Sequence, residues 1–518
     1  MDDKKIVAII HLTDENFTKD AMLALQKLKV PQGFSFDILP IEGEKKYAAY
    51  NFAMKNSDAK YKIYLDEKVI VRQENLLTEL IKTFKADKEI GLIGCSGAIQ
   101  LSTHGICFNS VKRCGKLQMG ANKNVAEWSA IEKDFCEVEA VDGWFMATQY
   151  DIPFKEEYET LADTAQCMDF RRQNYKVVAV KQKKSWLWYK SNVWHITEEN
   201  LKKFLAECSQ YIFPLVSVII PTFNRPQYFK LALESVLNQT YKNFEIVVSD
   251  DGTTDETEIL IQPYLEKYPC IKYFRNKGFT ADDNWNFLRK YNNPNAEYVN
   301  WLMDDDLFYP AKFEKMVEVY RNNPDVSLVG SFRDFIDGNG KIIGRSRQLL
   351  NNSGKLDGNE AGKFLLIADN FIGEPTTVLI RKKFLRENDL CWSEEHTGFY
   401  PLIDVSTWLQ LLTKGNMFWI NESLSAFRNH NEQGTHWDDM GPRTITCWAQ
   451  VLKMALDMKI FLKNEHDIRK AFLHWFRIFA YKLDLAADSN YRGESVLELE
   501  RIAIEMAKAF HSGYKIEF

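Results

Sequence analysis

Three consecutive carboxylates, Asp304, Asp305 and Asp306, directly follow an apolar run in the second half of the chain. Adjacent carboxylates repel one another, so such a cluster is costly unless a cation or a hydrogen-bond network compensates it. Hard oxygen ligands favour Mg²⁺ or Mn²⁺, which proteins usually share with the phosphates of a substrate. A lone acidic triplet is more often a solvated turn, but a second acidic pair, Asp250 and Asp251, follows another apolar run upstream. Together the two clusters favour a metal-assisted phosphate site.

The elements that position these groups follow from the apolar periodicity of the sequence. Short apolar runs predict buried strands at 216–220, 244–249 and 298–303, and helical spacing predicts helices near 227–238 and 404–412. Open α/β sheets bind ligands at the carboxyl ends of their strands, where the loops converge. We therefore expect one edge of the sheet to gather the polar residues that follow these strands, which are Thr222, Asn224, Asp250, Asp251 and Asp304 to Asp306.

The first half repeats this plan. Strand-like runs are predicted at 6–10 and 61–65, and the second of them ends in two acidic residues. A strand-end Asp, a later Asp and a final His recur at nearly matching separations, as Asp66, Asp163 and His195 and again as Asp304, Asp404 and His430. These ordered landmarks favour a tandem duplication over chance. Strands that alternate with helices predict two α/β domains with Rossmann-like, mostly parallel sheets.

Length and composition bound the remaining organisation. A chain of 518 residues is too long for one hydrophobic core, and the sequence divides into domains at 1–213 and 214–440 and a helical region at 441–518. The formal net charge of −6 does not suggest a nucleic-acid partner. Nine cysteines lack the spacing of a metal site, and no apolar stretch is long enough for a signal peptide or a membrane span. We therefore expect a cytoplasmic protein.

The segment VSVIIPTFNRPQYFKLALESVLNQTYKNFEIVVSDDGTTDET resembles the opening of family 2 glycosyltransferases of the GT-A fold. The resemblance continues through NWLMDDDLFYP, LIDVSTWLQLL and FRNHNEQGTH, and it spans roughly 214–436. It implies a nucleotide-sugar donor, with uridine as the nucleoside. One departure is visible at Met303, where many members begin their acidic motif with Asp.

The family motifs imply a role for each matching residue. The nucleoside, ribose and diphosphate of the donor would be bound by Pro221, Thr222, Asn224, Asp250, Asp251, Arg275 and Asp304. Of these, Asp304 would contact the ribose and Arg275 the diphosphate. A divalent manganese or magnesium ion would be bound by Asp305, Asp306 and His430.

Displacing a nucleoside diphosphate from a sugar requires a counter-charge for the leaving phosphates and a base for the proton of the acceptor. Asp404, on the predicted helix beyond the loop GEPTT, matches the base of the family. Its alternative role is that of a helix cap, which Asp fills well. The resemblance also implies inversion at the anomeric carbon. The expected acceptor is a glycan, a lipid-linked glycan or a protein.

The first half is similar to a second glycosyltransferase-like group, which resembles a protein of streptomycin biosynthesis and is also GT-A-like. The likeness spans about 5–195 and includes IGLIGCSG and DTAQCMDFRRQNYKVVAV. Where that group tends to place an Asp after the strand, this chain has Lys68, whose ammonium cannot ligate a divalent ion. The candidate residues of this half are Asp66, Lys68, Asp163 and His195.

Three roles are open for the first half. It transfers a second sugar, which makes the protein bifunctional. Alternatively, it is a non-catalytic module that binds the acceptor or a partner, or it catalyses without metal, with Lys68 facing the diphosphate. For the whole chain, a catalytically silent glycan-binding scaffold is the competing hypothesis. The intact carboxylates of the second half argue against that scaffold.

The C-terminal region predicts helices from about 443 onward. One apolar stripe, flanked by basic residues, is formed by Ile468, Phe472, Trp475, Phe476, Phe479 and Leu483. We expect this helix to pack on the catalytic domain or on a second subunit in a homo-oligomer. A peripheral contact with the inner face of the membrane, close to a lipid-linked acceptor, is the alternative.

Overall fold

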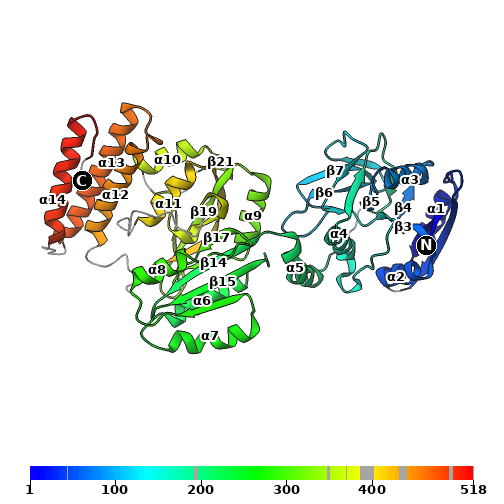
Figure 1. Ribbon diagram of the computed structural model, residues 1–518, viewed down its shortest axis with the longest axis horizontal. Helices are drawn as coiled ribbons and strands as arrows, with labels where there is room; N and C mark the ends of the chain where they lie inside the picture. The colour runs from blue at the N-terminus through cyan, green and yellow to red at the C-terminus, as the bar shows by residue number, and fades with distance from the viewer. Residues whose placement is uncertain are drawn as a thin grey trace. The chain divides into compact units, whose positions relative to one another are not determined.

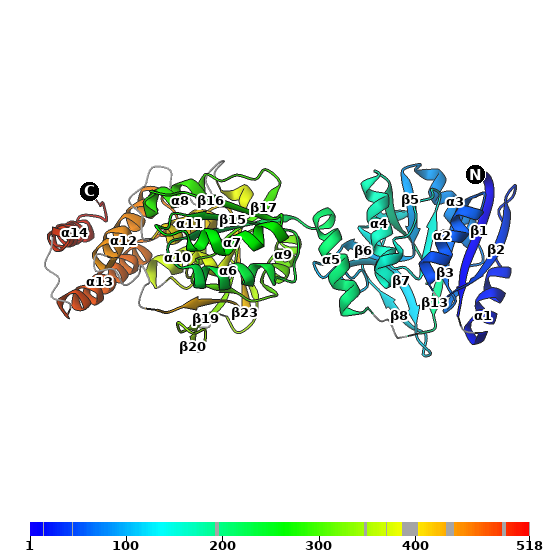
Figure 2. The same ribbon diagram turned by 90° about the horizontal axis from the view of Figure 1, so that it is seen from below.

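The computed structural model describes residues 1–13, 15–43, 45–191, 196–346, 350–368, 370–385, 402–430, 440–488 and 494–516. The chain folds into two compact units, residues 1–213 and 214–518, hereafter the first and the second unit (Figure 1, Figure 2). Each unit has its own sheet and its own core, and each is described by itself.

The first unit is built on a seven-stranded sheet. Its strands, in spatial order, are β2 (Ser35–Glu42), β1 (Asp2–Leu12), β3 (Ala59–Asp66), β11 (Phe145–Thr148), β5 (Ile90–Gly94), β12 (Lys176–Val180) and β9 (Phe135–Glu137). β1 pairs in parallel with β2 and β3, and β12 pairs in parallel with β5. β11 runs antiparallel to both of its neighbours, β3 and β5.

Both faces of this sheet are buried, which explains why its strands read as continuous apolar runs. Along β1, Ile6 and Ile10 join one core cluster, and Val7 and Ile9 join the other. The helices of the unit are α1 (Glu15–Gln26), α2 (Lys46–Asn56), α3 (Leu76–Ala86), η1 (Glu156–Leu161), α4 (Ala162–Arg172) and α5 (Glu198–Ile212). A smaller sheet contains β10 (Ala140–Val141), β6 (Ser96–Gln100), β7 (Lys112–Met119), β13 (Leu187–Tyr189), β4 (Val69–Val71) and β8 (Asn124–Glu127).

The second unit contains a ten-stranded sheet. The strands along its main path are β16 (Ile271–Arg275), β15 (Phe244–Asp250), β14 (Leu215–Thr222), β17 (Ala296–Trp301), β22 (Val378–Arg381), β19 (Val326–Ile336), β23 (Asn416–Arg428) and β18 (Leu307–Phe308). β20 (Ile342–Arg345) pairs with β19, and β21 (Gly354–Leu356) pairs with β23. The first four strands are parallel, whereas β22 is antiparallel to β17 and to β19.

Helices complete the second unit and share its core. They are α6 (Pro226–Leu237), α7 (Glu256–Lys267), α8 (Ala281–Arg289), α9 (Lys312–Asn322), α10 (Gly358–Ile367), η2 (Pro375–Thr377), η3 (Lys382–Phe384), α11 (Ile403–Leu412), α12 (Met440–Asp457), α13 (Glu465–Asp488) and α14 (Glu494–His511). Phe472 and Trp475 of the predicted apolar stripe are buried in the same core cluster as Trp408 and Trp419. The stripe of α13 therefore packs within the unit, where α13 contacts α10, α12 and α14. No described helix is both long and apolar enough to cross a bilayer.

The two units share one topology. The order β2-β1-β3-β11-β5-β12 in the first unit corresponds to β15-β14-β17-β22-β19-β23 in the second, with matching strand directions throughout. Two tandem GT-A-like α/β domains are therefore present. The expectation of mostly parallel sheets needs correction, because β11 and β22 reverse the direction and make both sheets mixed. Apolar periodicity could not show this, since it reports which face is buried and not which way a strand runs.

Candidate functional site

Hydrogen bonds join the end of β14 to the acidic residues that follow β17. The hydroxyl of Thr222, the last residue of β14, donates to Oδ2 of Asp304 at 2.9 Å. The backbone N–H of Phe223 donates to the same oxygen at 3.3 Å. Asp304 is buried, and burial, reinforced by the charge of Asp305, raises its pKa to about 7. Thr222 and Asp304, which the sequence placed after different strands, are therefore in direct contact.

Asp305 lies between two groups that can carry positive charge. Nε2 of His430 is 3.0 Å from Oδ2 of Asp305, and the guanidinium of Arg225 is 3.2 Å from the same oxygen. Arg225 also lies 3.4 Å from Oδ1 of Asp304. The ring of His430 packs on that of Tyr228 with 4.8 Å between the centroids, which orients the imidazole. The fold thus brings together Asp305 and His430, which are far apart in the sequence.

Asp306 points to other partners. Its Oδ2 accepts a hydrogen bond from the hydroxyl of Thr376 at 2.6 Å, and its Oδ1 accepts one from the backbone N–H of Arg428 at 3.0 Å. Burial, together with the charge of Asp305, raises its pKa well above the usual range. Because each of its oxygens is bound by a protein donor, Asp306 joins the acidic segment to β23. The structure does not bring it to His430, contrary to the expected ligand set.

The residues present fit a divalent ion in part. Among the residues that the structure describes, no three His, Cys, Asp or Glu side chains come close enough together to hold a metal ion by themselves. The carboxylate oxygen of Asp305 and the imidazole nitrogen of His430 are nevertheless donors that Mn²⁺ accepts. The remaining positions around such an ion would fall to phosphate oxygens, as is usual for ions shared with a nucleotide.

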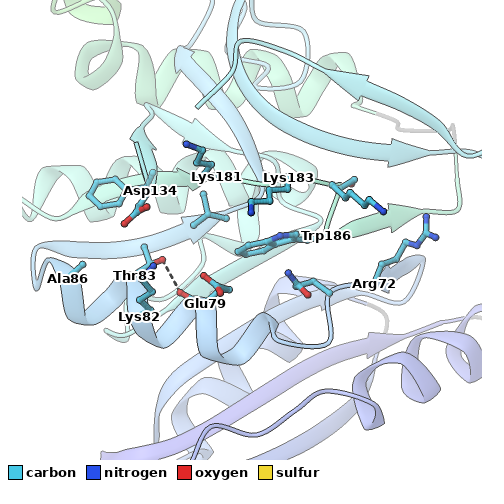
Figure 3. Close-up of a pocket in the computed structure, with 14 residues that line it drawn as sticks. Arg72, Glu79, Lys82, Thr83, Ala86, Asp134, Lys181, Lys183 and Trp186 are labelled. Carbon is cyan, nitrogen blue, oxygen red and sulfur yellow. Dashed lines mark hydrogen bonds between the residues drawn. The ribbon is translucent and has the colours of Figure 1, made fainter. Parts of the chain in front are cut away.

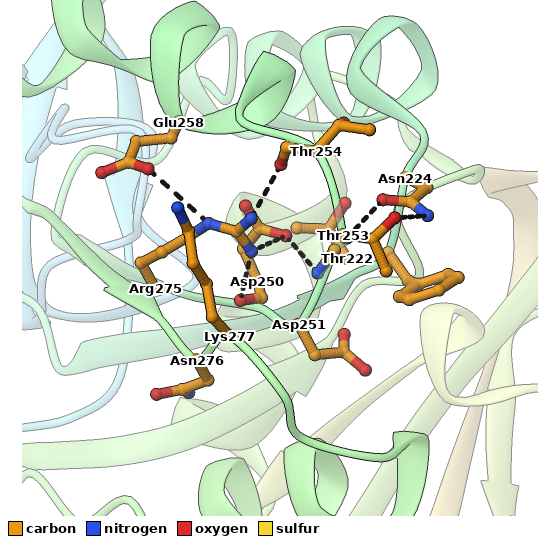
Figure 4. Close-up of polar contacts among 12 residues, drawn as sticks. Thr222, Asn224, Asp250, Asp251, Thr253, Thr254, Glu258, Arg275, Asn276 and Lys277 are labelled. Atoms are coloured by element: carbon orange, nitrogen blue, oxygen red, sulfur yellow. Dashed lines mark hydrogen bonds and ion pairs between the residues drawn. The ribbon is translucent and has the colours of Figure 1, made fainter.

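The end of β15 forms a second group of polar contacts (Figure 4). Oδ1 of Asp250 accepts the backbone N–H of Gly252 at 2.8 Å, and Oδ2 accepts the hydroxyl of Tyr273 at 2.6 Å. Oδ1 of Asp251 accepts the side-chain amide of Asn284 at 2.7 Å. Burial raises the pKa of Asp251 to about 6. The carboxylate of Asp250 therefore shapes the turn. Within the part of the chain that the structure describes, Oδ2 of Asp251 accepts no hydrogen bond from another residue, so it can face a ligand.

Asn224 and Arg275 frame this turn. Asn224 has a positive φ of 52°, a conformation that Asn tolerates better than most residues, and its Oδ1 accepts the N–H of Thr253 at 2.8 Å. The Arg275 guanidinium lies 3.3 Å from Oδ1 of Asp250 and donates to the carbonyl of Thr254 at 2.7 Å (Figure 4). Further ion pairs join Arg275 to Asp255 and Glu258. Arg275 therefore buttresses the loop, and its contact with the diphosphate stays a prediction.

Pro221 and Thr222 close β14 beside β15. Pro221 lies opposite Ser249 in the parallel register, and Thr222 lies opposite Asp250. The backbone N–H of Asp251 donates to the carbonyl of Thr222 at 3.3 Å. The two strand ends thus form one continuous surface.

Asp404 is the second residue of α11 and is partly exposed to solvent. Its Oδ1 accepts the backbone N–H of Val405 at 2.7 Å, and its Oδ2 accepts the side-chain amide of Asn370 at 3.4 Å. Burial raises its pKa to about 7, and the charge of Glu374 adds to that rise. A carboxylate with a pKa near neutrality is suited to accept a proton from a hydroxyl.

The charge of Glu374 acts both on Asp404 and on the acidic residues 304–306. Its charge also raises the pKa of Asp306, and its own pKa is raised by burial and by the charge of Asp305. The guanidinium of Arg333 pairs with Glu374 at 2.6 Å. The sequence analysis did not single out Glu374, although it lies in the quoted loop GEPTT.

Other contributors were also missed. Arg225 stands in the motif PTFNRP, so a local signal existed. Asn284 lies on α8 and Arg428 at the end of β23, and each meets its acidic partner only through the fold. Nothing in their local sequence marks them.

In the first unit, the end of β3 is also tied to the loop after β1. The backbone N–H of Thr13 donates to Oε2 of Glu67 at 2.6 Å, and the Thr13 hydroxyl donates to the other carboxylate oxygen. Glu67 is buried. Its contacts therefore repeat those that Asp304 makes with Thr222 and Phe223.

Asp66 and Lys68 flank Glu67 and face different groups. The ammonium of Lys46 lies 3.4 Å from Oδ2 of Asp66. Burial alone would raise the pKa of Asp66, but Lys46 and Lys68 outweigh that effect and hold the pKa below its usual range. The Lys68 ammonium lies over the ring of Phe17, 5.8 Å from its centroid. The cation paired with Asp66 is thus Lys46, a residue that the sequence analysis did not name.

Asp163 is the second residue of α4 and is buried. Its Oδ1 accepts the backbone N–H of Thr164 at 2.6 Å, and burial raises its pKa to about 6. Asp163 and Asp66 line one cavity of about 620 Å³, together with Lys46 and Tyr189. That volume is typical of small-molecule sites. The fourth candidate of this half, His195, lies outside the residues that the structure describes.

A second hollow of the first unit, of about 610 Å³, lies against α3 and the segment that follows β12 (Figure 3). Basic residues outnumber acidic ones in its lining, with Arg72, Lys82, Lys181, Lys183 and Lys184 against Glu79 and Asp134. None of the site residues expected from the sequence lines this hollow.

Both halves of the chain match known protein families. Residues 7–208 match the model described as "Glycosyltransferase like family", and residues 217–388 match "Glycosyl transferase family 2". A protein of Rickettsia bellii named as an uncharacterized glycosyltransferase is 30% identical over 227 residues, which are 43% of this chain and 31% of that protein. The chain spans about a third of the length of the Rickettsia relatives it matches first.

Two further similarities concern proteins with more specific names. The GalNAc(5)-diNAcBac-PP-undecaprenol beta-1,3-glucosyltransferase of Campylobacter jejuni is 26% identical over 281 residues, 54% of this chain and 85% of that protein. The crystal structure of TarS from S. aureus matches at 18% identity with a TM-score of 0.38, over 51% of this chain and 44% of that one. The family models thus identify a glycosyltransferase-like region at residues 7–208 in the first unit and a glycosyl transferase family 2 region at residues 217–388 in the second.

Proposed function

We propose that the second unit transfers a sugar from a nucleotide donor, with uridine as the nucleoside, to a hydroxyl of a glycan acceptor. The observation that carries this proposal is the junction of the three strand ends. There, the hydroxyl of Thr222 donates to Asp304, and Asp305 contacts His430. Asp251 is held in place by the side-chain amide of Asn284. Parallel strands present their carboxyl ends to ligands at such an edge.

In this proposal the nucleoside lies against Pro221, Thr222 and Asn224. The free oxygen of Asp251 accepts a hydrogen bond from the base, and Asp304 faces the ribose. Asp250 and Arg275 support the site from behind, because their side chains are bound to the loop itself. Arg225, which touches both Asp304 and Asp305, supplies positive charge on the side of the phosphates.

Asp305 and His430 would hold a divalent manganese or magnesium ion, which supplies counter-charge to the phosphates when bound. Asp404 takes the proton of the acceptor hydroxyl. The acceptor oxygen bonds to the anomeric carbon while the bond from that carbon to the diphosphate breaks, and the electron pair leaves with the diphosphate. Attack opposite the leaving group inverts the anomeric configuration.

The acceptor is proposed to be a lipid-linked glycan, because the Campylobacter relative is named for a glycan carried on undecaprenyl diphosphate. A surface glycan or a protein are the other acceptors of the same hydroxyl chemistry. The competing function, a silent glycan-binding scaffold, is disfavoured by the carboxylates kept together at the strand ends, where Asp304 contacts Thr222 and Asp305 contacts His430.

The test is nucleotide release by the full-length chain from a panel of UDP-sugars, with Mn²⁺ and with excess EDTA. Asp305→Ala should lower release in Mn²⁺ by about 100-fold or more, because the counter-charge for the leaving group is lost. Glu422→Ala, which removes an exposed carboxylate paired with Lys315 in the same unit, is the matched control and should change little. Full release in EDTA would contradict the metal-dependent proposal, and no release from any donor would contradict the transferase itself.

A further inference from the structure

The acidic end of β17 has a positional counterpart at the end of β3. β1 pairs in parallel with β3 in the first unit, as β14 does with β17 in the second, and the matching register pairs are Ile9 opposite Tyr64 and Ile219 opposite Trp301. Counting forward equally from these pairs places Glu67 where the second unit has Asp304, and Thr13 where it has Phe223. Hydrogen bonds confirm this correspondence, because the N–H of Thr13 donates to Glu67 as that of Phe223 donates to Asp304.

The next position carries opposite charges in the two units. Where the second unit has Asp305, the first has Lys68. The backbone N–H of Lys190, the residue after β13, donates to the carbonyl of Lys68 at 2.9 Å. Both ammonium groups lie over one ring, that of Phe17, at 5.8 Å for Lys68 and 5.6 Å for Lys190. A second cation is thus held beside Lys68, and the pairing of β4 with β13, compared with that of β18 with β23, gives Lys190 the position of Arg428 in the second unit.

The two ammonium groups differ in whether an acid pairs with them directly. Lys190 pairs with Asp20. Within the described ranges, no carboxylate forms an ion pair with the ammonium of Lys68, and Asp66 pairs with Lys46 instead. Gathering like charges is unfavourable unless an anion is bound between them. An ammonium also repels a divalent ion, so this arrangement disfavours a metal. The two lysines supply the positive charge that a metal ion would otherwise bring.

We propose that the first unit binds the diphosphate of a nucleotide sugar without a divalent ion, through the ammonium groups of Lys68 and Lys190. The inference rests on the proposed function in taking the site of the second unit as its reference. The sugar attached to the diphosphate would enter the cavity of about 620 Å³, whose wall includes Asp66 and Tyr189, close neighbours of the two lysines in the chain.

The far wall of that cavity strengthens the correspondence. Asp163 and Asp404 are each the second residue of the helix that precedes the last of the corresponding strands. Each accepts the backbone N–H of the following residue, at 2.6 Å from Thr164 and 2.7 Å from Val405. The first unit therefore keeps the carboxylate that faces an acceptor and differs at the phosphate side.

The test is calorimetric titration of the full-length chain with UDP, GDP and dTDP, each in excess EDTA. At least one nucleotide should bind, and its affinity should fall as salt rises, since exposed charges are screened. Lys68→Met combined with Lys190→Met should weaken that binding by about tenfold or more, because two charge-assisted contacts are lost. Lys68→Arg keeps the charge and should retain most of the affinity, and the thermal transition of each variant reports whether it folds.

Lys183→Met combined with Lys184→Met is the matched control. It removes two exposed lysines of the same unit from the basic hollow of Figure 3, away from β3, and should leave nucleotide affinity unchanged. The inference is overturned if no nucleotide binds in EDTA, or if the Lys68 and Lys190 variant binds as the wild type does. It is equally overturned if only the Lys183 and Lys184 variant loses binding. Failure of the proposed function gives a different result. In that case the affinity for UDP in Mn²⁺ would be the same with and without Asp305.

Discussion

The two units differ most at one position, the residue that directly follows Glu67 in the first unit and Asp304 in the second. In the second unit this residue is Asp305, paired with His430 and Arg225. In the first it is Lys68, gathered with Lys190 over Phe17. Strand order and direction are the same on both sides of this difference. The shared scaffold therefore carries opposite charges at this position, while in both units a carboxylate of raised pKa is the second residue of the helix before the last corresponding strand.

This comparison separates two requirements of a glycosyl transfer site. The carboxylate on the acceptor side depends on burial for its basicity, and burial is fixed by the shared helix position. The counter-charge for the phosphates only has to be positive, so a metal or a lysine can supply it. The side chains that supply the charge are therefore freer to diverge than the fold that positions the base.

The largest expected effect comes from removing the base of the second unit. Asp404→Asn keeps the shape of the side chain and removes its basicity, so turnover in Mn²⁺ should fall by about 10²- to 10⁴-fold. Donor affinity measured by calorimetry should persist. Asp357→Asn is the control, since Asp357 caps the start of α10 in the same unit and should not affect turnover. Asp163→Asn should cost much less in Mn²⁺, and an equal loss from both variants would contradict the separation of the two sites.

Turnover should also fall at low pH, because Asp404 must be ionised to act as a base. Its pKa is raised to about 7, and the base must be ionised to accept a proton. Turnover in the second unit should therefore drop by about tenfold for each pH unit below that value and level off above it. Single-turnover rates at saturating donor, measured from about pH 5 to about pH 9, test this dependence. A profile that stays flat through pH 6 would mean that Asp404 is not the titrating base.

Exchanging the divergent residues should convert one site towards the other. Lys68→Asp combined with Lys190→His gives the first unit a carboxylate at the position of Asp305 and an imidazole beside it. Nucleotide binding by this variant should become dependent on Mn²⁺, with an affinity gain of about tenfold on adding the ion. The measurement is calorimetry with and without Mn²⁺ in an Asp305→Ala background. No response to the ion would show that the two sites differ by more than these side chains.

The smallest expected effect concerns stability. Thr222 is buried and Thr13 is exposed, although each donates a hydroxyl to the corresponding acid. Thr222→Val should cost about 1–3 kcal/mol of unfolding free energy because it leaves Asp304 short of a buried donor, and Thr13→Val should cost less than about 1 kcal/mol. Denaturant unfolding measures both, and Thr222→Ser, which keeps the hydroxyl, is the control. Equal losses at the two positions would contradict the role of burial.

Much of the fold was accessible from the sequence. The apolar runs at 216–220 and 244–249 correspond to β14 and β15, and the predicted helix at 404–412 corresponds to α11. Asp404 was placed at the start of that helix because a local motif surrounds it. Strand direction was less accessible, since a short run such as β22 reads the same whether it is parallel or antiparallel.

The sequence by itself determined which residues carry chemistry, because residue types and their order along the chain are local facts. The tertiary structure alone decided which of them meet. It directed Asp306 to Thr376 and Arg428, committed Arg275 to Asp250, and brought Lys190 beside Lys68. The reason is physical. A buried carboxylate takes whichever donors the packing of distant strands places within hydrogen-bond reach, and no local pattern encodes that choice.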